Sequence, residues 1–145
     1  MKRASGVVWA VSLAALCTPG SAAEAPPASA GQLVGNTLSA VAYVPRAPGM
    51  AGGGELARIM LQAYLRADGR ALVRAWDPSR DAYTPAVERN WTLSGTSFCV
   101  GLPAAPGSIC ADIHIWGPRL AGVGIHPYAM LDGDLQPGNA LAAAR

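Results

Sequence analysis

Alternating side chains between Trp91 and Gly117 constrain the fold of this chain more than any other feature. Two alternating segments flank a Pro- and Gly-rich connection at 103–108, and each carries one cysteine, Cys99 or Cys110. Because successive side chains of a strand point to opposite faces, the pattern predicts an antiparallel hairpin in which the two cysteines face each other. One face of that hairpin is apolar and consists of Phe98, Val100, Ile109, Ala111, Ile113 and Ile115. The other face carries Cys99, Cys110, Asp112, His114 and Trp116.

Residues 1–23 have the three parts of a secretory signal peptide. A positive start at 1–3 precedes an apolar run at 7–17, and the small residues at 21–23 allow cleavage after Ala23, with Ala22 as the alternative. The apolar run is too short to span a membrane. The segment therefore predicts a periplasmic or secreted protein with no transmembrane segment.

A lipoprotein modified at Cys17 is the alternative interpretation of this N-terminus. Leu16 argues against it, because lipoprotein processing requires a small residue at that position. Removal of the signal peptide leaves Cys99 and Cys110 as the only cysteines. An even number of cysteines in an oxidising compartment predicts a disulfide, which would add about 2–3 kcal/mol to the free energy of unfolding. The alternative is a pair of buried free thiols.

The remaining chain divides into a Pro-, Ala- and Ser-rich tether at 24–32, expected to be disordered, and a single domain at 33–145. Loss of Lys2 and Arg3 reduces eleven basic residues to nine, which balance the nine acidic ones. No lysine is left in the mature chain. A nucleic-acid partner is therefore not expected, because such a protein carries a net basic surface.

The segment at 55–65 fits both a helix and a strand, because its apolar residues satisfy both periods. The turn that follows it favours the strand. Ala67-Asp68-Gly69 has the composition of a three-residue hairpin loop that is closed by a left-handed glycine. With this loop, the pairs that face each other across the hairpin are all apolar: Leu65 with Ala71, Ala63 with Val73, and Leu61 with Ala75.

Other short segments, separated by Gly and Pro turns, complete an all-β pattern. We expect strands at 32–44, 87–93, 119–126 and 135–141, and a turn at 130–134. The glycines of 119–126 indicate strong coiling or close backbone approach. About eight such strands predict a small antiparallel up-and-down barrel or a sandwich. The tetrapeptides GNTL at 35–38 and GNAL at 138–141 are compatible with first and last strands that lie side by side in a closed barrel.

These signals follow one another in a recognisable order. GNTL is followed by an aromatic strand before Ala-Asp-Gly, a Trp strand, Cys99, Cys110, a late Asp-Gly turn and a closing Pro-Gly-Asn. Between Leu33 and Leu141, this order resembles small exported bacterial proteins of unknown function with a lipocalin-like β-barrel. The resemblance implies the fold and the compartment, and it supplies no catalytic residue.

One strand face of the 55–76 hairpin gathers arginines and aromatic residues, and we predict that it binds a ligand. Its members are Tyr64, Arg66, Arg70, Arg74 and Trp76. Arginine forks bind carboxylate and phosphate, and aromatic rings stack on sugars or guanidinium planes. An anionic envelope glycan or a lipid headgroup would suit this face, and a periplasmic protein is the other possible partner. The alternative is a solvated strand face on which Trp76 covers the barrel end.

Asp112 and His114 lie two residues apart and therefore share a strand face, where they could act as an acid–base pair. An exposed polar face beside a disulfide is the plainer interpretation. No serine occupies a nucleophile-elbow motif. His114 and His126 lie near the ends of neighbouring strands, but no ligand spacing of a zinc site accompanies them. We therefore expect neither a metal nor a cofactor.

The sequence thus favours an exported, non-enzymatic binding module for a small or envelope-derived ligand or for a protein partner. One alternative is a periplasmic enzyme that uses Asp112 and His114. The other is a purely structural component of the cell envelope. A barrel of about eight strands either holds one small ligand or is filled by its own side chains, and the composition leaves both options open.

Overall fold

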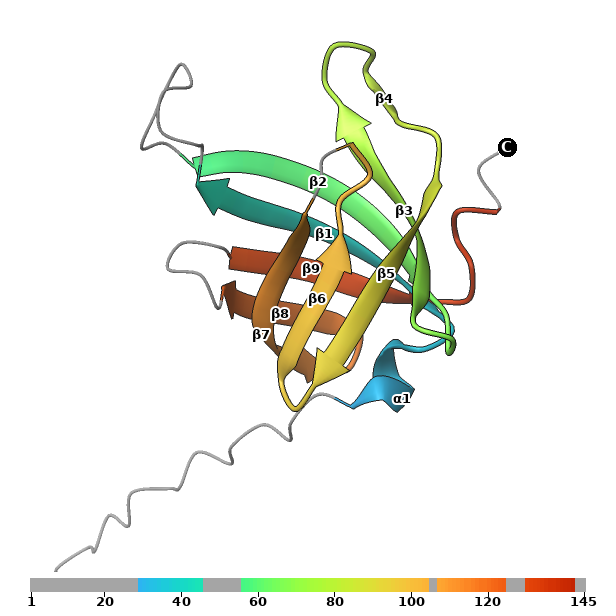
Figure 1. Ribbon diagram of the computed structural model, residues 1–145, viewed down its shortest axis with the longest axis vertical. Helices are drawn as coiled ribbons and strands as arrows, with labels where there is room; N and C mark the ends of the chain where they lie inside the picture. The colour runs from blue at the N-terminus through green and yellow to red at the C-terminus, as the bar shows by residue number, and fades with distance from the viewer. Residues whose placement is uncertain (1–28, 46–55, 105–106, 125–129, 143–145) are drawn as a thin grey trace, which may run out of the picture.

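The computed structural model describes residues 29–45, 56–104, 107–124 and 130–142 (Figure 1). The predicted signal peptide, the first part of the predicted tether, and His126 lie outside these residues. The described part contains one short helix and nine strands. Their bounds are α1 (Ala30–Leu33), β1 (Asn36–Pro45), β2 (Leu56–Leu65), β3 (Arg70–Asp77), β4 (Ala82–Tyr83), β5 (Val87–Ser94), β6 (Ser97–Gly101), β7 (Ser108–Trp116), β8 (Arg119–Gly124) and β9 (Met130–Pro137).

Eight of the strands close into an antiparallel barrel, so that the barrel and not the sandwich is the architecture. Each strand pairs with its neighbours along the chain, β4 is bound only to the end of β3, and β9 closes the barrel against β1. Leu38 pairs with Leu135 in this closing contact. Gly138 N also donates a hydrogen bond to Gly35 O at 3.0 Å, which joins the two matching tetrapeptides. The first and last strands therefore lie side by side, as predicted.

The registers predicted for the two hairpins are confirmed. Cys99 pairs with Cys110 between β6 and β7, and their sulfur atoms lie 2.06 Å apart, which confirms the disulfide. Residues 56–65 form a strand, and Leu65 pairs with Ala71 as expected from the three-residue loop. Gly69 has a φ of 76°, the left-handed conformation that this loop requires.

The segment at 130–134 was expected to be a turn, and this prediction is wrong. It forms the first half of β9, and the last strand ends at Pro137 instead of Leu141. The glycine in this segment serves a close approach of strands. A Cβ atom on Gly133 would lie 2.5 Å from the carbonyl oxygen of Ser39 in β1. Gly122 in β8 is similar, since its Cβ would lie 2.9 Å from the Cβ of Ala111, as the predicted close approach requires.

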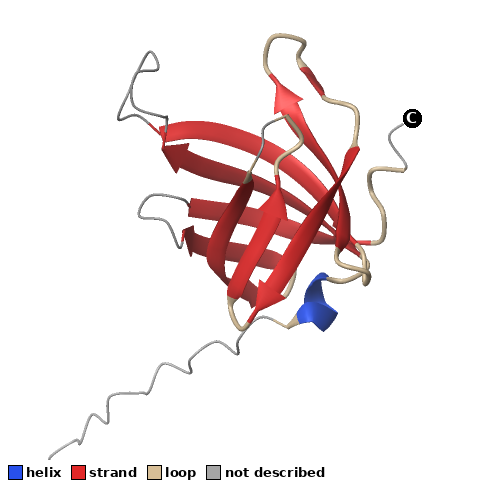
Figure 2. Cartoon of the chain, in the orientation of Figure 1, coloured by secondary structure: helices blue, strands red, loops and turns tan. Residues whose placement is uncertain are grey.

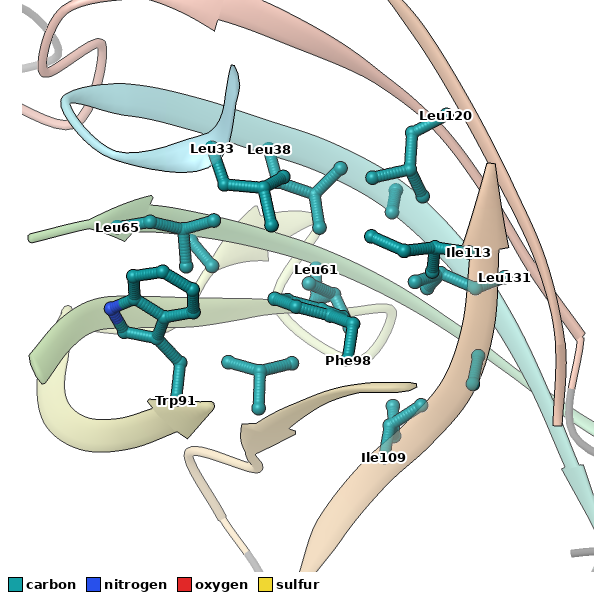
Figure 3. Close-up of a cluster of buried hydrophobic side chains, with 14 of the residues drawn as sticks. Leu33, Leu38, Leu61, Leu65, Trp91, Phe98, Ile109, Ile113, Leu120 and Leu131 are labelled. Carbon is teal, nitrogen blue, oxygen red and sulfur yellow. The ribbon is translucent and has the colours of Figure 1, made fainter. Parts of the chain in front are cut away.

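The hydrophobic core fills the centre of the barrel (Figure 3). Phe98, Leu61 and Ile113 are at most 1% exposed there. Leu33 of α1 is fully buried and closes one end. The strand expected at 32–44 begins only at Asn36, because Gln32 and Leu33 belong to α1, which starts within the segment 24–32. Near this end the indole Nε1 of Trp91 donates a hydrogen bond to Arg66 O at 2.9 Å. The ring thereby stays buried with its polar atom satisfied.

The two ends of the barrel have connections of different length. Short turns join β2 to β3, β5 to β6, and β7 to β8 at the end where α1 lies (Figure 2). At the opposite end, longer connections join β1 to β2, β3 to β5, β6 to β7, and β8 to β9. The second of these contains β4 and lies against the outside of the barrel, where it contributes to the site described next.

Candidate functional site

The predicted arginine–aromatic face lies on the outside of the barrel, because Leu61, Ala63 and Leu65 of the same hairpin point inward and are buried. Its five residues do not form one site. Tyr64 near the end of β2 lies with Arg66 and Arg70 at the tight turn between β2 and β3. Arg74 and Trp76 lie further along β3 toward the opposite end of the barrel. The two groups have different surroundings.

Carboxylates already compensate the charges of Arg66 and Arg70. Arg66 forms ion pairs with Asp68 and, through Nη1 at 3.1 Å, with Glu88. Arg70 Nη2 lies 2.8 Å from the second oxygen of Glu88, and Arg70 Nη1 donates to Asn90 Oδ1 at 3.0 Å. All of these side chains are exposed, so each ion pair is worth at most about 1 kcal/mol. This half of the predicted site is a neutral surface network.

Arg74 is half-buried and is held from two sides. Its Nε donates a hydrogen bond to Gln62 Oε1 at 2.8 Å, and its guanidinium carbon lies 4.8 Å from the centre of the Tyr83 ring. The Tyr83 ring in turn meets the Trp76 ring edge-on, with 5.2 Å between the centroids. Gln62 Nε2 donates to Ser39 Oγ at 3.2 Å, which fixes the amide. The arginine is therefore oriented before any ligand arrives.

Tyr83 belongs to the site, and sequence reasoning missed it. It lies in β4, where two residues are too few to show any period. Thr84 holds this segment against β3: its N–H donates to Ala75 O at 2.8 Å, and its Oγ1 accepts from Ala75 N at 3.1 Å. A two-residue strand that is held by a few hydrogen bonds to β3 leaves no signal in the sequence.

A groove of about 660 Å³ lies beside Arg74 on the outer face of β3. The segment at 83–86 forms one wall, and residues 139–142 form the other. Thr37, which is fully buried, fixes the second wall. Its Oγ1 donates to Gly138 O at 2.7 Å and accepts from Ala140 N at 3.0 Å. We call this space the Arg74 groove.

Asp112 and His114 share the outer face of β7, as predicted, and both are exposed. They have separate partners. Asp112 accepts a hydrogen bond from Thr96 Oγ1 at 3.3 Å, and the His114 ring stacks on the Trp116 ring with 5.9 Å between centroids. Within the described residues no hydrogen bond joins the carboxylate to the imidazole. Nothing in this arrangement orients the pair for proton transfer.

A second groove, of about 470 Å³, crosses the outside of β1, β9, β8 and β7. Large apolar side chains stand around it and are exposed to solvent: Tyr43 at 36%, Trp116 at 50%, Met130 at 56% and Val123 at 70%. Met130 pairs with both Tyr43 and Val123, so three of these residues are adjacent on neighbouring strands. We call this space the apolar outer groove.

The outward residues of β8 and β9 are a signal for this groove in the sequence. Outward positions of a half-solvated strand are usually polar, yet β8 and β9 carry Val123 and Met130 there. Because 130–134 was interpreted as a turn, Met130 was not assigned to a strand face.

No three histidine, cysteine, aspartate or glutamate side chains of the described ranges gather as metal ligands would. Across the same ranges, no helix has both the length and the apolar character needed to cross a bilayer. Comparison with protein-family models, with curated proteins and with solved structures finds no match. The two grooves on the outside of the barrel are therefore the candidate binding sites.

Proposed function

We propose that this chain is an exported, non-enzymatic binding module that docks a protein partner at the apolar outer groove. The observation that carries the proposal is the exposure of Tyr43, Trp116, Val123 and Met130 on four adjacent strands. Contiguous exposed apolar patches mark interaction sites on soluble proteins. Trp, Tyr and Met are also enriched at protein interfaces, where buried aromatic residues dominate the binding energy.

The residues around the groove have the distribution of a protein interface. Arg58 pairs with Tyr43 on one side, Asp112 pairs with Val123 on the other, and Asp132 lines the groove itself, so charged residues border the apolar side chains. Full burial of one large apolar side chain contributes about 1.5–3 kcal/mol. Since the four side chains are only partly exposed, their burial would yield about half of that each, enough for a reversible complex once the cost of association is subtracted.

A ligand inside the barrel is less well supported than a partner outside it. The centre is occupied by Phe98, Leu61 and Ile113, which a central ligand would have to displace. Displacement of a packed core costs several kcal/mol for each large side chain. An enzymatic role for Asp112 and His114 is also less well supported, because the imidazole stacks on Trp116 at the edge of the apolar outer groove.

Export rests on residues 1–23, and the Cys99–Cys110 bridge supports it. Structural disulfides persist in the periplasm and outside the cell, and they are rare in the cytosol. The sulfurs lie at bonding distance on the outer face of β6 and β7. The proposal therefore places the partner in the periplasm or at the cell exterior.

Site-specific photo-cross-linking in the native host tests the proposed docking site. A photoreactive side chain replaces Val123 in the apolar outer groove, or Thr92 as a control. Thr92 is an exposed position of β5, which lies four strands from β9 around the barrel. We expect one protein adduct from position 123, none from position 92, and loss of the adduct when Met130→Glu is added. Equal labelling from both positions, or an adduct that survives Met130→Glu, would contradict the proposal.

A further inference from the structure

We infer that the Arg74 groove is a second binding site, which takes a small amphipathic carboxylate: one anionic head on a short apolar body. The site is independent of the apolar outer groove. β3 and β8 lie four strands apart in either direction around the eight-stranded barrel, so the two grooves occupy different sides.

Arg74 indicates that the head of the ligand is a carboxylate. Among the described residues, Arg74 donates a hydrogen bond through Nε alone, and no carboxylate pairs with its Nη1 and Nη2. The other half-buried arginine of the barrel, Arg89, differs from it. All three of its nitrogens donate hydrogen bonds to backbone carbonyl oxygens: Nε to Leu102 O at 2.8 Å, Nη1 to Glu88 O at 2.9 Å and Nη2 to Pro103 O at 2.7 Å. Arg74 is thus half-buried, oriented and available to bind both oxygens of a carboxylate.

The apolar residues that line the Arg74 groove indicate that the body of the ligand is apolar. Leu72 lies beside Arg74 on the outer face of β3, and Pro85 and Leu141 line the groove from its two sides. Leu141 is only 8% exposed, so the second wall is packed against the barrel. Its anchoring by Thr37 makes the groove part of the fold. Figure 1 shows the β3–β5 connection and the C-terminal segment on the same side of the barrel.

Two polar groups of the walls complete the head site. Asn139 lines the groove and uses its Oδ1 to accept from Leu141 N at 3.1 Å, which leaves the amide Nδ2 as a donor. Thr84 also lines the groove and has a hydroxyl hydrogen to donate. No aspartate or glutamate is among the described residues that line the groove, and such a set of donors suits an anion. The volume of about 660 Å³ lies within the range of small-ligand sites.

The test is a ¹H–¹⁵N NMR titration of the disulfide-bonded protein, purified from a host that exports it. Octanoate is the probe, acetate supplies the head without the body, and octyl glucoside supplies the body without the charge. We expect octanoate to shift saturably the signals of Arg74 Nε–H and of the Thr84 and Leu141 backbone amides. Acetate and octyl glucoside should bind at least tenfold more weakly. Binding of acetate as tight as that of octanoate would overturn the assignment of an amphipathic ligand.

Variants separate this site from the rest of the surface. Arg74→Met should weaken octanoate at least tenfold, while Arg80→Gln, in the exposed turn that follows β3, should leave it unchanged. Arg74→Lys keeps the positive charge but loses the forked guanidinium, so it should weaken octanoate binding about three- to tenfold. If Arg74→Met does not fold, Arg74→Lys serves as the test variant, and its NMR spectrum shows whether it is folded. Unchanged affinity in either Arg74 variant would overturn the inference. Trp116→Ser should remove the cross-linked partner and leave octanoate binding intact, which keeps the two proposals distinguishable.

Discussion

Thr37 is the buried polar side chain that ties the C-terminal segment to the barrel. Its hydroxyl joins Gly138 O and Ala140 N, so it fixes the wall of the Arg74 groove that contains Leu141. We predict that Thr37→Val lowers the free energy of unfolding by about 1–3 kcal/mol, because both backbone groups lose a partner. Urea unfolding measures this loss. Thr92→Val, at an exposed position, should change it by less than about 0.5 kcal/mol, and equal effects of the two substitutions would refute the role of Thr37.

Asp77 offers a prediction of pH dependence. Its pKa lies below the ordinary value of 3.8, mainly because Ser79 Oγ donates it a hydrogen bond, and the Ser79 N–H and Arg80 add to the effect. Because the folded pKa is lower than the unfolded one, this contribution to stability is present above about pH 4 and is lost as pH falls through the folded pKa. Ser79→Ala should move the pKa upward toward 3.8. A ¹³C NMR titration of the carboxyl checks this, with Ser94→Ala as control; an unmoved pKa would show that the hydrogen bond is not the cause.

Gly133 lets β9 approach β1 closely, and a side chain at this position would affect the pairing of the two strands. A Cβ atom there would lie 2.7 Å from the Cβ of Ala40 and 2.5 Å from Ser39 O, so the closing pair of strands must move apart. We predict that Gly133→Ala destabilises the barrel by about 1–3 kcal/mol. Gly31→Ala is the matched control, since its Cβ would meet only Ser29 Oγ at 3.9 Å. Thermal or urea unfolding compares the two, and a neutral Gly133→Ala would contradict the tight closure.

The same residue explains where sequence reasoning failed among the elements. Asp-Gly pairs usually mark turns, and Asp132-Gly133 was assigned to one. Here the glycine is needed because a Cβ atom would clash with β1, and Ser39 of β1 lies 94 residues before Gly133 in the sequence. A local sequence pattern cannot reveal a contact over such a separation. The strand at 56–65 was predicted correctly for the opposite reason. Its turn, Ala67-Asp68-Gly69, lies next to it and sets the register locally.

At the scale of the whole molecule, the closed barrel could be predicted and most of the surface sites could not. Alternation and turn residues specify the inward face, so the sequence alone places Phe98 and Ile113 on the apolar face of their hairpin, and both are buried in the core. The outward face depends on which strands become neighbours. Glu88 pairs with Arg66 and Arg70 only because β5 lies beside β3, and Tyr83 reaches Arg74 only because β4 folds back on the barrel.

The central claim is that the outside of the barrel, and not its centre, binds a protein partner. Native mass spectrometry on protein taken gently from its own host tests it most directly, with wild type beside Val123→Glu/Met130→Glu. Both positions are more than half exposed, at 70% and 56%, so the double variant should fold. We predict a complex of the wild-type barrel with one protein, loss of that protein from the variant, and a gain of two hydrogens on reduction of each barrel. A wild-type barrel without a protein partner, or the same protein partner on both wild type and variant, would contradict the account.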